Sequence, residues 1–225
     1  MHEVSETLAI EIVPVTPFQQ NTTILRDRAT GKGAIVDPGG EGERLIAACA
    51  RDEVEVVAIL LTHGHVDHAG AATELARHFA VPVIGPGEGD RFWLESLPQQ
   101  AASFGLGHPA EVVRPDRWLE DGDTVEVGEL RFEVLACPGH TPGHVVFFHR
   151  PSKLLIVGDV LFQGSIGRTD FPKGDYDTLI RSIQEKLLPL GDEVTFLPGH
   201  GPTSTLGRER IGNPFLVHPE AYRPG

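Results

Sequence analysis

The sequence predicts an α/β fold, a four-layer αβ/βα sandwich, in one domain that spans residues 1–225. Two β-rich halves can be traced along the chain, and helical segments follow each of them. Several apolar, strand-like segments also end in a glycine or proline followed by a polar side chain. Such strand ends are a usual place for an active site in α/β proteins. A chain of 225 residues is long enough to bury a sizeable core.

The first half is expected to contain five strands and two helices. Its most informative strand covers residues 56–61, VVAILL, which are apolar and partly β-branched. The other strands are expected at residues 8–13, 22–26, 34–37 and 81–84, and the helices at residues 41–51 and 68–79. Residues 87–104 mix a short helical segment with a proline and form a candidate lid. In the second half, we expect strands at residues 124–127, 131–135, 145–149, 154–157 and 193–197, and a helix at residues 176–188.

A cluster of histidines follows the strand at residues 56–61. Residues 62–70 read THGHVDHAG, which places His63, His65, Asp67 and His68 within six positions. Imidazole and carboxylate groups together suit zinc, iron or manganese. Because residues two apart in an extended segment point the same way, His63 and His65 can bind one ion together. Asp67 and His68 face elsewhere, which suits a second ion or a supporting role, whereas a solvated polar loop is the alternative interpretation.

Three later segments repeat this arrangement. The motif CPGHTPGH at residues 137–144 follows one strand-like segment, and IVGD, ending in Asp159, closes another. A third segment, TFLPGH, ends in His200. Each of them alone is compatible with an ordinary loop. Four ligand-bearing strand ends in one chain predict a metal site at one edge of the sandwich.

These motifs, together with IVDPGG at residues 35–40, resemble those of the metallo-β-lactamase fold superfamily over nearly the whole chain. Within the superfamily, the chain resembles the glyoxalase II group, the hydroxyacylglutathione hydrolases, and in particular their short, YcbL-type branch. Three stretches carry this closer resemblance: IGP at residues 84–86 with FWL at residues 92–94, GRTDFP at residues 167–172, and PGHGPTST at residues 198–205.

The resemblance implies a site for one or two divalent metal ions, with zinc as the expected metal and iron or manganese as alternatives. Each ion would be held by three side chains, with Asp159 bridging the two: His63, His65 and His140 for the first, and Asp67, His68 and His200 for the second. His144 is then expected to support the ligands. Asp37, at the end of an apolar strand, is expected to orient the metal loop.

The activity implied by the resemblance is that of a type II glyoxalase in methylglyoxal detoxification. A thioester such as S-lactoylglutathione would be hydrolysed to a 2-hydroxy acid and glutathione by a hydroxide held at the metals, with Asp67 orienting the hydroxide and passing on its proton. A thiolate leaves readily because a thiol pKa is about 8.5, whereas an amide nitrogen would need protonation. The chemistry therefore suits a small-molecule thioester as the partner, including a glutathione conjugate.

Arg168 stands where these enzymes hold the glutathione part with a basic residue, and an arginine can pair with a carboxylate. The alternative is that Arg168 braces Asp170 or Asp175 at the surface. Only 25 residues follow His200 in this sequence, so we do not expect the C-terminal helical domain of the long glyoxalase II enzymes. A broader range of thioesters is accordingly a second expectation.

Composition excludes several other classes of protein. The formal net charge of −13 argues against a nucleic-acid partner, which requires a basic face. The sequence contains no apolar run long enough for a membrane span, and the N-terminus lacks the basic region of a signal peptide. Cys49 and Cys137 provide no disulfide framework, which favours the reducing cytoplasm.

Three alternatives remain open from the sequence. A mononuclear iron persulfide dioxygenase shares the histidine cluster and a similar GRTDF loop, although His144 and the PGHGP ending favour the hydrolase. A lactonase or β-lactamase of the same superfamily is the second alternative. A β-lactamase is usually exported, and no export signal is visible. A metal-binding protein without enzymatic activity is the third, and the loss of a ligand would favour it.

Overall fold

The computed structural model describes residues 1–106 and 110–224, which form two six-stranded sheets and a short hairpin. The first sheet runs in sequence order: β1 (His2–Glu3), β2 (Leu8–Val15), β3 (Gln20–Asp27), β4 (Lys32–Val36), β5 (Glu55–Leu60) and β6 (Val83–Ile84). The second sheet has the order β14 (Ser204–Thr205), β13 (Thr195–Pro198), β10 (Leu154–Gly158), β9 (Val145–His149), β8 (Leu130–Ala136) and β7 (Thr124–Val127). The hairpin pairs β11 (Leu161–Phe162) with β12 (Ser165–Ile166).

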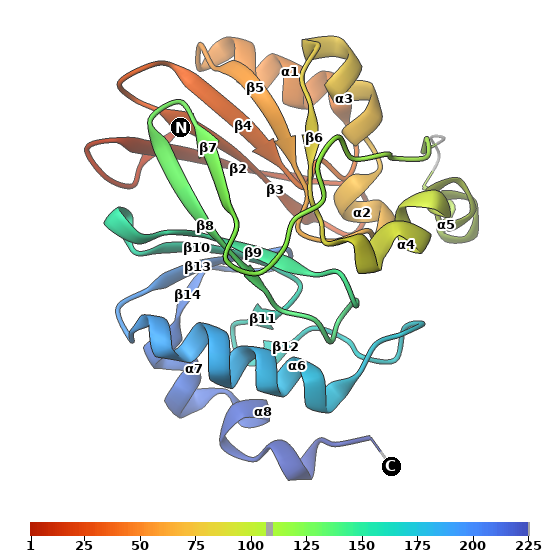
Figure 1. Ribbon diagram of the computed structural model, residues 1–225, viewed down its shortest axis with the longest axis vertical. Coiled ribbons are helices and arrows are strands. Elements are labelled where there is room, and N and C mark those ends of the chain that lie inside the picture. The colour runs from red at the N-terminus through yellow and green to blue at the C-terminus, as the bar shows by residue number, and fades with distance from the viewer. Residues whose placement is uncertain (107–109, 225) are drawn as a thin grey trace.

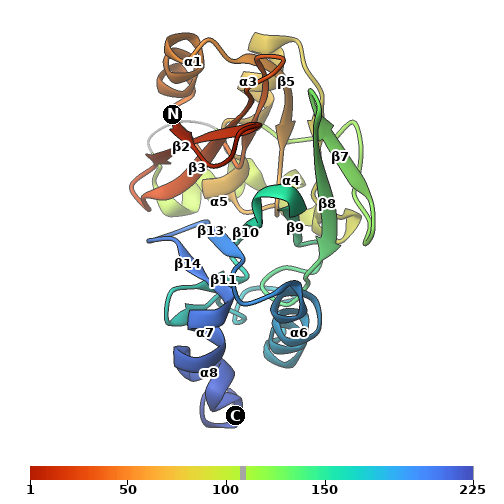
Figure 2. The same ribbon diagram turned by 90° about the vertical axis from the view of Figure 1, so that its left-hand side faces the viewer.

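Helices cover the outer faces of the two sheets, as Figures 1 and 2 show. On the first sheet lie α1 (Gly42–Arg51), α2 (Val66–Ala69), α3 (Ala72–Phe79), α4 (Arg91–Glu95) and α5 (Leu97–Phe104). On the second lie α6 (Tyr176–Ser182), which continues through a π-helical turn (Ile183–Leu187), α7 (Leu206–Gly212) and α8 (Pro214–Val217). The layers follow the order helix, sheet, sheet, helix, so the predicted four-layer sandwich is confirmed.

Three hydrophobic clusters hold these layers together. The central cluster joins the facing sides of the two sheets and includes Leu60 from β5 and Ile156 from β10. The neighbouring residues Ile59 and Leu155 point the opposite way, into the clusters beneath the helices. Successive side chains of a strand alternate between its two faces, so both strands are buried on both sides. This double burial explains why the two sequences are almost continuously apolar.

Parallel pairing places several strand ends at one edge of the sandwich. Strand β5 runs parallel to both β4 and β6 in the first sheet, and β10 runs parallel to β13 in the second. Parallel neighbours need a crossover, and helices supply it in each case: α1, the α2–α3 pair and α6. The carboxyl ends of β4, β5, β10 and β13 consequently meet, and the loops that leave them face one another.

Most of the predicted strands are confirmed within one or two residues, but the single helix expected at residues 68–79 is wrong. Two helices occupy this region, α2 and α3, separated at Gly70 and Ala71. The loop after β4 causes the break, because Ala71 N donates a hydrogen bond to Pro38 O. A Cβ atom on Gly70 would lie 2.5 Å from Gly39 O, so glycine permits this close approach. Among the described helices, none is long and apolar enough to cross a bilayer.

Candidate metal centre and active site

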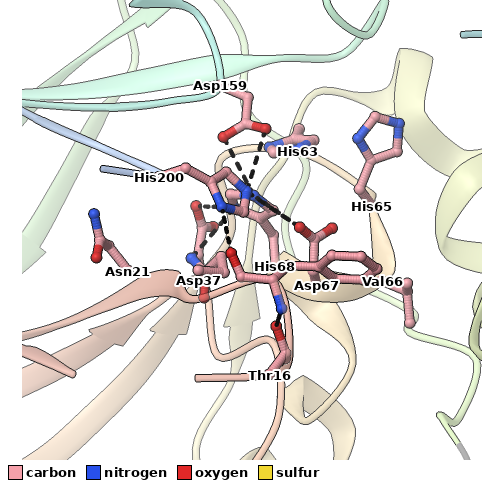
Figure 3. A network of polar contacts seen from close by, with 12 residues as sticks. Thr16, Asn21, Asp37, His63, His65, Val66, Asp67, His68, Asp159 and His200 are labelled. Atoms are coloured by element: carbon pink, nitrogen blue, oxygen red, sulfur yellow. Dashed lines mark hydrogen bonds and ion pairs between the residues drawn. The ribbon is translucent and has the colours of Figure 1, made fainter. Parts of the chain in front are cut away.

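The candidate ligands gather at the shared edge of the two sheets, and all of them except His140 are labelled in Figure 3. Four of them lie in α2 or in the loop between β5 and α2 of the first half: His63, His65, Asp67 and His68. The other three follow strands β8, β10 and β13 of the second sheet: His140, Asp159 and His200. They form two groups, within each of which the potential ligand atoms lie within 4.8 Å of one another: His63, His65 and His140, and Asp67, His68 and His200.

Asp159 stands between the two groups. Its Oδ1 lies 3.3 Å from His68 Nε2, and its Oδ2 lies 3.7 Å from both His140 Nε2 and His200 Nε2. The Asp159 backbone N–H donates a hydrogen bond to His144 Nε2 at 3.1 Å, and the His144 ring stacks on His63 at 4.7 Å between ring centres. His144 therefore contacts the candidate ligands without belonging to either group.

The ring of His140 is oriented by a hydrogen bond from its Nδ1 atom to the backbone. His140 Nδ1 lies 2.7 Å from the carbonyl oxygen of Arg168, so this nitrogen carries the proton and donates it. The remaining nitrogen, His140 Nε2, is left with its lone pair and lies 3.0 Å from His65 Nδ1. Fixing one ring nitrogen by a hydrogen bond to a carbonyl is the usual way in which proteins orient a metal-binding histidine.

A hydrogen-bond chain orients two histidines of the first sheet in the same manner. The Thr62 hydroxyl donates to Asp37 Oδ2 at 2.6 Å and lies 3.0 Å from His63 Nδ1, from which it can only accept. His68 Nδ1 lies 3.0 Å from the same Asp37 oxygen and donates to it. The two Nδ1 atoms therefore hold the protons, and both Nε2 atoms keep their lone pairs. Asp37 fills the supporting place expected for it.

Four buried polar atoms in this cluster have no hydrogen-bond partner among the described residues: His63 Nε2, His65 Nε2, His68 Nε2 and Asp159 Oδ1. Buried polar atoms are normally satisfied, so this concentration at one place calls for a bound group. Nitrogen and carboxylate donors suit a divalent cation such as zinc or iron. The residues present therefore fit the predicted metal site.

The electrostatic balance of the cluster also favours a cation. Burial disfavours the charged form of His68, yet Asp159 and Asp67 raise its pKa well above the ordinary value. Burial likewise opposes ionisation of Asp159, but the neighbouring His68 and His140 hold its pKa well below its usual range. Burial lowers the pKa of His65 to about 3, so this ring is neutral and able to act as a ligand at physiological pH.

The cluster opens into a cavity of about 390 Å³ with aromatic walls. His65, Asp67, His140, Asp159 and His200 lie along it, and the remaining lining is largely aromatic: Phe18, Trp93, Phe104, Phe162 and Phe171, with Gln100 and Arg168. The segment at residues 87–104, expected as a lid, supplies part of this wall through α4 and α5. Its movement stays a prediction.

Arg168 reaches this cavity, but its guanidinium already has a partner. It donates to both carboxylate oxygens of Asp170, at 2.9 and 2.7 Å, and its Cζ lies 4.3 Å from the centre of the Phe171 ring. Both members of the ion pair are two-thirds exposed. Arg168 therefore lines the cavity while it pairs with Asp170, and its contact with a substrate carboxylate stays a prediction.

Several residues around the site carried no signal in the sequence. Gln100 caps the start of α2, since its Oε1 accepts from Val66 N at 3.0 Å and its Nε2 donates to Trp93 O at 2.8 Å. Phe18 comes from the turn between β2 and β3, and its carbonyl lies 3.2 Å from His200 Nδ1. The contacts of Gln100 with Val66 and of Phe18 with His200 join segments far apart in the chain, which explains why local patterns did not identify these residues.

An αβ/βα sandwich with two groups of candidate histidine and carboxylate ligands at one edge is the arrangement expected of a metal-dependent hydrolase. The chain belongs to the metallo-β-lactamase superfamily, whose family model matches residues 15–213. The hydroxyacylglutathione hydrolase GloC of Haemophilus influenzae is 50% identical over 208 residues, which cover 92% of this chain and 97% of that protein. The probable metallo-hydrolase YqgX of Bacillus subtilis is 37% identical over 204 residues, covering 91% and 95% of the two chains.

Solved structures support the same family. BLEG-1, a B3 metallo-β-lactamase, superposes with a TM-score of 0.85 at 38% identity, over 93% of this chain and all of that chain. TTHA1623, crystallised in a di-iron-bound form, superposes with a TM-score of 0.83 at 37% identity, over 92% of this chain and all of that chain. The sequence-based recognition of the family is thereby confirmed.

Proposed function

We propose that this protein is a metal-dependent thioester hydrolase of the hydroxyacylglutathione type, which releases a 2-hydroxy acid and a thiol such as glutathione. The observation that carries the proposal is the opening of both ligand groups into one aromatic-walled cavity. The 50% identity to GloC supports the same reaction. Because both sheets contribute ligands to this cavity, we further propose that residues 1–225 act as one domain.

In the proposed assignment, His63, His65 and His140 would hold one ion and Asp67, His68 and His200 a second, with Asp159 placed between the two groups. Divalent metals in such a site polarise a carbonyl oxygen and lower the pKa of a water molecule. Asp67 Oδ2 faces His200 Nε2 at 3.2 Å, which leaves Oδ1 as the atom that accepts the proton of the attacking water. Hydrogen bonds from Nδ1 of His63, His68 and His140 fix the orientation of these rings, so that each Nε2 atom faces the site.

The cavity walls suit a thioester substrate. Phe18, Phe104 and Phe162 exclude water around the acyl group and the sulfur atom, while the remaining donors of Arg168 face an anionic end of the substrate. A thiolate departs without help from a general acid, since a thiol pKa is about 8.5. The unpaired and buried Cys49 and Cys137 support the cytoplasmic setting inferred from the sequence.

The resemblance to BLEG-1 favours β-lactam hydrolysis as a second candidate activity. This reaction requires protonation of a departing nitrogen. Asp67 would have to return the proton that it takes from water, because the other acid that lines the cavity among the described residues, Asp159, stands between the two ligand groups. The thioester is therefore the better match for the side chains present.

The test uses purified protein of measured metal content, assayed with S-lactoylglutathione, a thioester without glutathione, a penicillin, and glutathione persulfide with oxygen uptake. We expect turnover of the glutathione thioester to be fastest. His140→Ala should lower both the metal content and the rate. His149→Ala is the matched control, because His149 is equally buried but lies at the opposite end of β9 from His144. Absence of thioester hydrolysis by fully metallated protein, or dominant oxygen uptake, would overturn the proposal.

A further inference from the structure

One buried carboxylate ties together the two loops that carry the first ligand group. Asp90 precedes α4 and is fully buried. Its Oδ1 accepts a hydrogen bond from Gly143 N at 2.6 Å, and its Oδ2 accepts from Thr141 Oγ1 at 2.7 Å and from Gly64 N at 2.9 Å. Asp90 is neither a candidate ligand nor part of the cavity wall.

The donors to Asp90 stand beside the histidines of the first ligand group. Gly64 separates His63 from His65 on the loop of the first sheet, whereas Thr141 directly follows His140 on the loop of the second sheet. The three histidines of the first group therefore stand on two loops that share one carboxyl group. Any change in the separation of the loops would stretch at least one of the three hydrogen bonds.

The backbone around Asp90 is packed closely enough to make this link rigid. A Cβ atom on Gly143 would lie 2.5 Å from Asp90 N, and a Cβ atom on Gly64 would lie 3.2 Å from Asp90 O. Gly87 N also donates to Gly143 O at 2.8 Å. The segment before α4 therefore packs tightly between the two loops, and glycine at positions 64 and 143 permits this close backbone contact.

Burial of the Asp90 carboxylate disfavours its ionised form. Burial raises the pKa of Asp90 to about 6, although its hydrogen bonds from Thr141, Gly143 and Gly64 act in the opposite direction. Among the described residues, no lysine, arginine or histidine forms an ion pair with it. Hydrogen bonds therefore satisfy this buried carboxylate, and Gly64 and Thr141, which donate two of them, stand directly beside the histidines of the first group.

We propose that Asp90 is a positioning residue for the first metal group: its carboxylate clamps the loop of His63 and His65 against the loop of His140. The proposal rests on the assignment of these histidines as ligands. Replacing one carboxylate oxygen is expected to break the clamp. Because each oxygen accepts a backbone N–H, the amide of Asp90→Asn must face one of these N–H groups in either orientation.

The experiment measures metal affinity, which does not depend on the identity of the substrate. Zn²⁺ is titrated against a chelator into stripped Asp90→Asn protein, and the absorption spectrum of the Co²⁺ form reports the ligand geometry. We expect the affinity of the tighter site to fall about ten- to a hundredfold, the usual effect of removing a group that orients metal ligands. The Co²⁺ spectrum should change as well.

Asp27→Asn is the matched control. Asp27 is equally buried and also accepts two backbone N–H groups and one threonine hydroxyl, from Ala29, Glu129 and Thr30, but it is the last residue of β3 and contacts neither metal-group loop. This variant should lose stability without losing metal affinity. Equal losses of affinity in the two variants, or parental affinity in Asp90→Asn, would overturn the proposal.

A second pair of variants keeps the test decisive if Asp90→Asn does not fold. Thr141→Val removes one donor to Asp90 and should weaken Zn²⁺ binding, whereas Thr141→Ser keeps the hydroxyl and should restore it. Equal affinity of the two variants would overturn the proposal. A protein that binds Zn²⁺ as described but hydrolyses no thioester would contradict the proposed function alone and leave the role of Asp90 intact.

Discussion

Because Arg168 pairs with Asp170, we predict that substitutions of these two residues change KM in opposite directions. If Arg168 binds the carboxylate of a glutathione-type substrate, Arg168→Ala should raise KM with little change in kcat, because the bond exists in both the ground state and the transition state. Asp170→Asn should do the reverse. It removes the carboxylate that occupies two donors of the guanidinium, at 2.9 and 2.7 Å, and frees them for the substrate.

The size of the effect follows from the exposure of Arg168. A charge-assisted hydrogen bond is typically worth about 1.5–3 kcal/mol. The lower end applies here, because solvent screens the exposed side chain and Asp170 shares its charge. A loss of about 1.5 kcal/mol corresponds to about tenfold in kcat/KM.

The assay compares S-lactoylglutathione with a neutral thioester of the same acyl group. Arg168→Ala should affect the anionic substrate alone, and Asp170→Asn should lower its KM. Both effects should weaken at high salt, as expected for an exposed charge. Equal losses for the two substrates would mean that Arg168 only braces the loop through Asp170 and Phe171, and the reasoning would be refuted.

Four further changes test other parts of the structure. Phe104→Ala should raise the KM of thioesters with long apolar acyl groups roughly three- to tenfold in steady-state kinetics, because Phe104 meets Phe18 edge to face on the cavity wall. Gly64→Ala should lower stability to urea by about 1–3 kcal/mol, because its Cβ would lie 2.7 Å from Trp93 Cβ. Removal of the metal should lower the Tm in calorimetry, since the native state alone binds it tightly. Burial opposes ionisation of Asp27, but hydrogen bonds from Thr30 and two backbone N–H groups lower its pKa. Its stabilising effect is therefore present above about pH 4 and lost as the pH falls further. The gap in urea midpoint between the parent and Asp27→Asn should accordingly be wider at pH 7 than at pH 3.

The sequence was most informative where a pattern is local. Alternation along an extended segment predicted that His63 and His65 act together, and the continuous apolar runs predicted strands. The break between α2 and α3 was missed because its cause, the contact of Gly70 with Gly39, joins loops from different strands. A periodic pattern contains no information about such a neighbour.

The same limit applies to the site. Motifs identified the candidate ligands because metal chemistry restricts the residue types that can serve. Asp90 and Gln100 are ordinary polar residues that stand outside the motifs, and they gain their roles only through contacts with distant loops. The partner of Arg168 was among the two that the sequence left open, and only its geometry distinguished Asp170 from Asp175.

The division of the candidate ligands between the two sheets has a consequence for folding. Neither half of the chain carries a full group of three for the first ion, because His140 comes from the second sheet and its two partners come from the first. Tight metal uptake must therefore wait until the two sheets have met. An ion held by side chains of both sheets would then link the two halves and slow the unfolding of the sandwich. The rate at which a nascent chain acquires its metal would thus report the moment at which the sandwich closes.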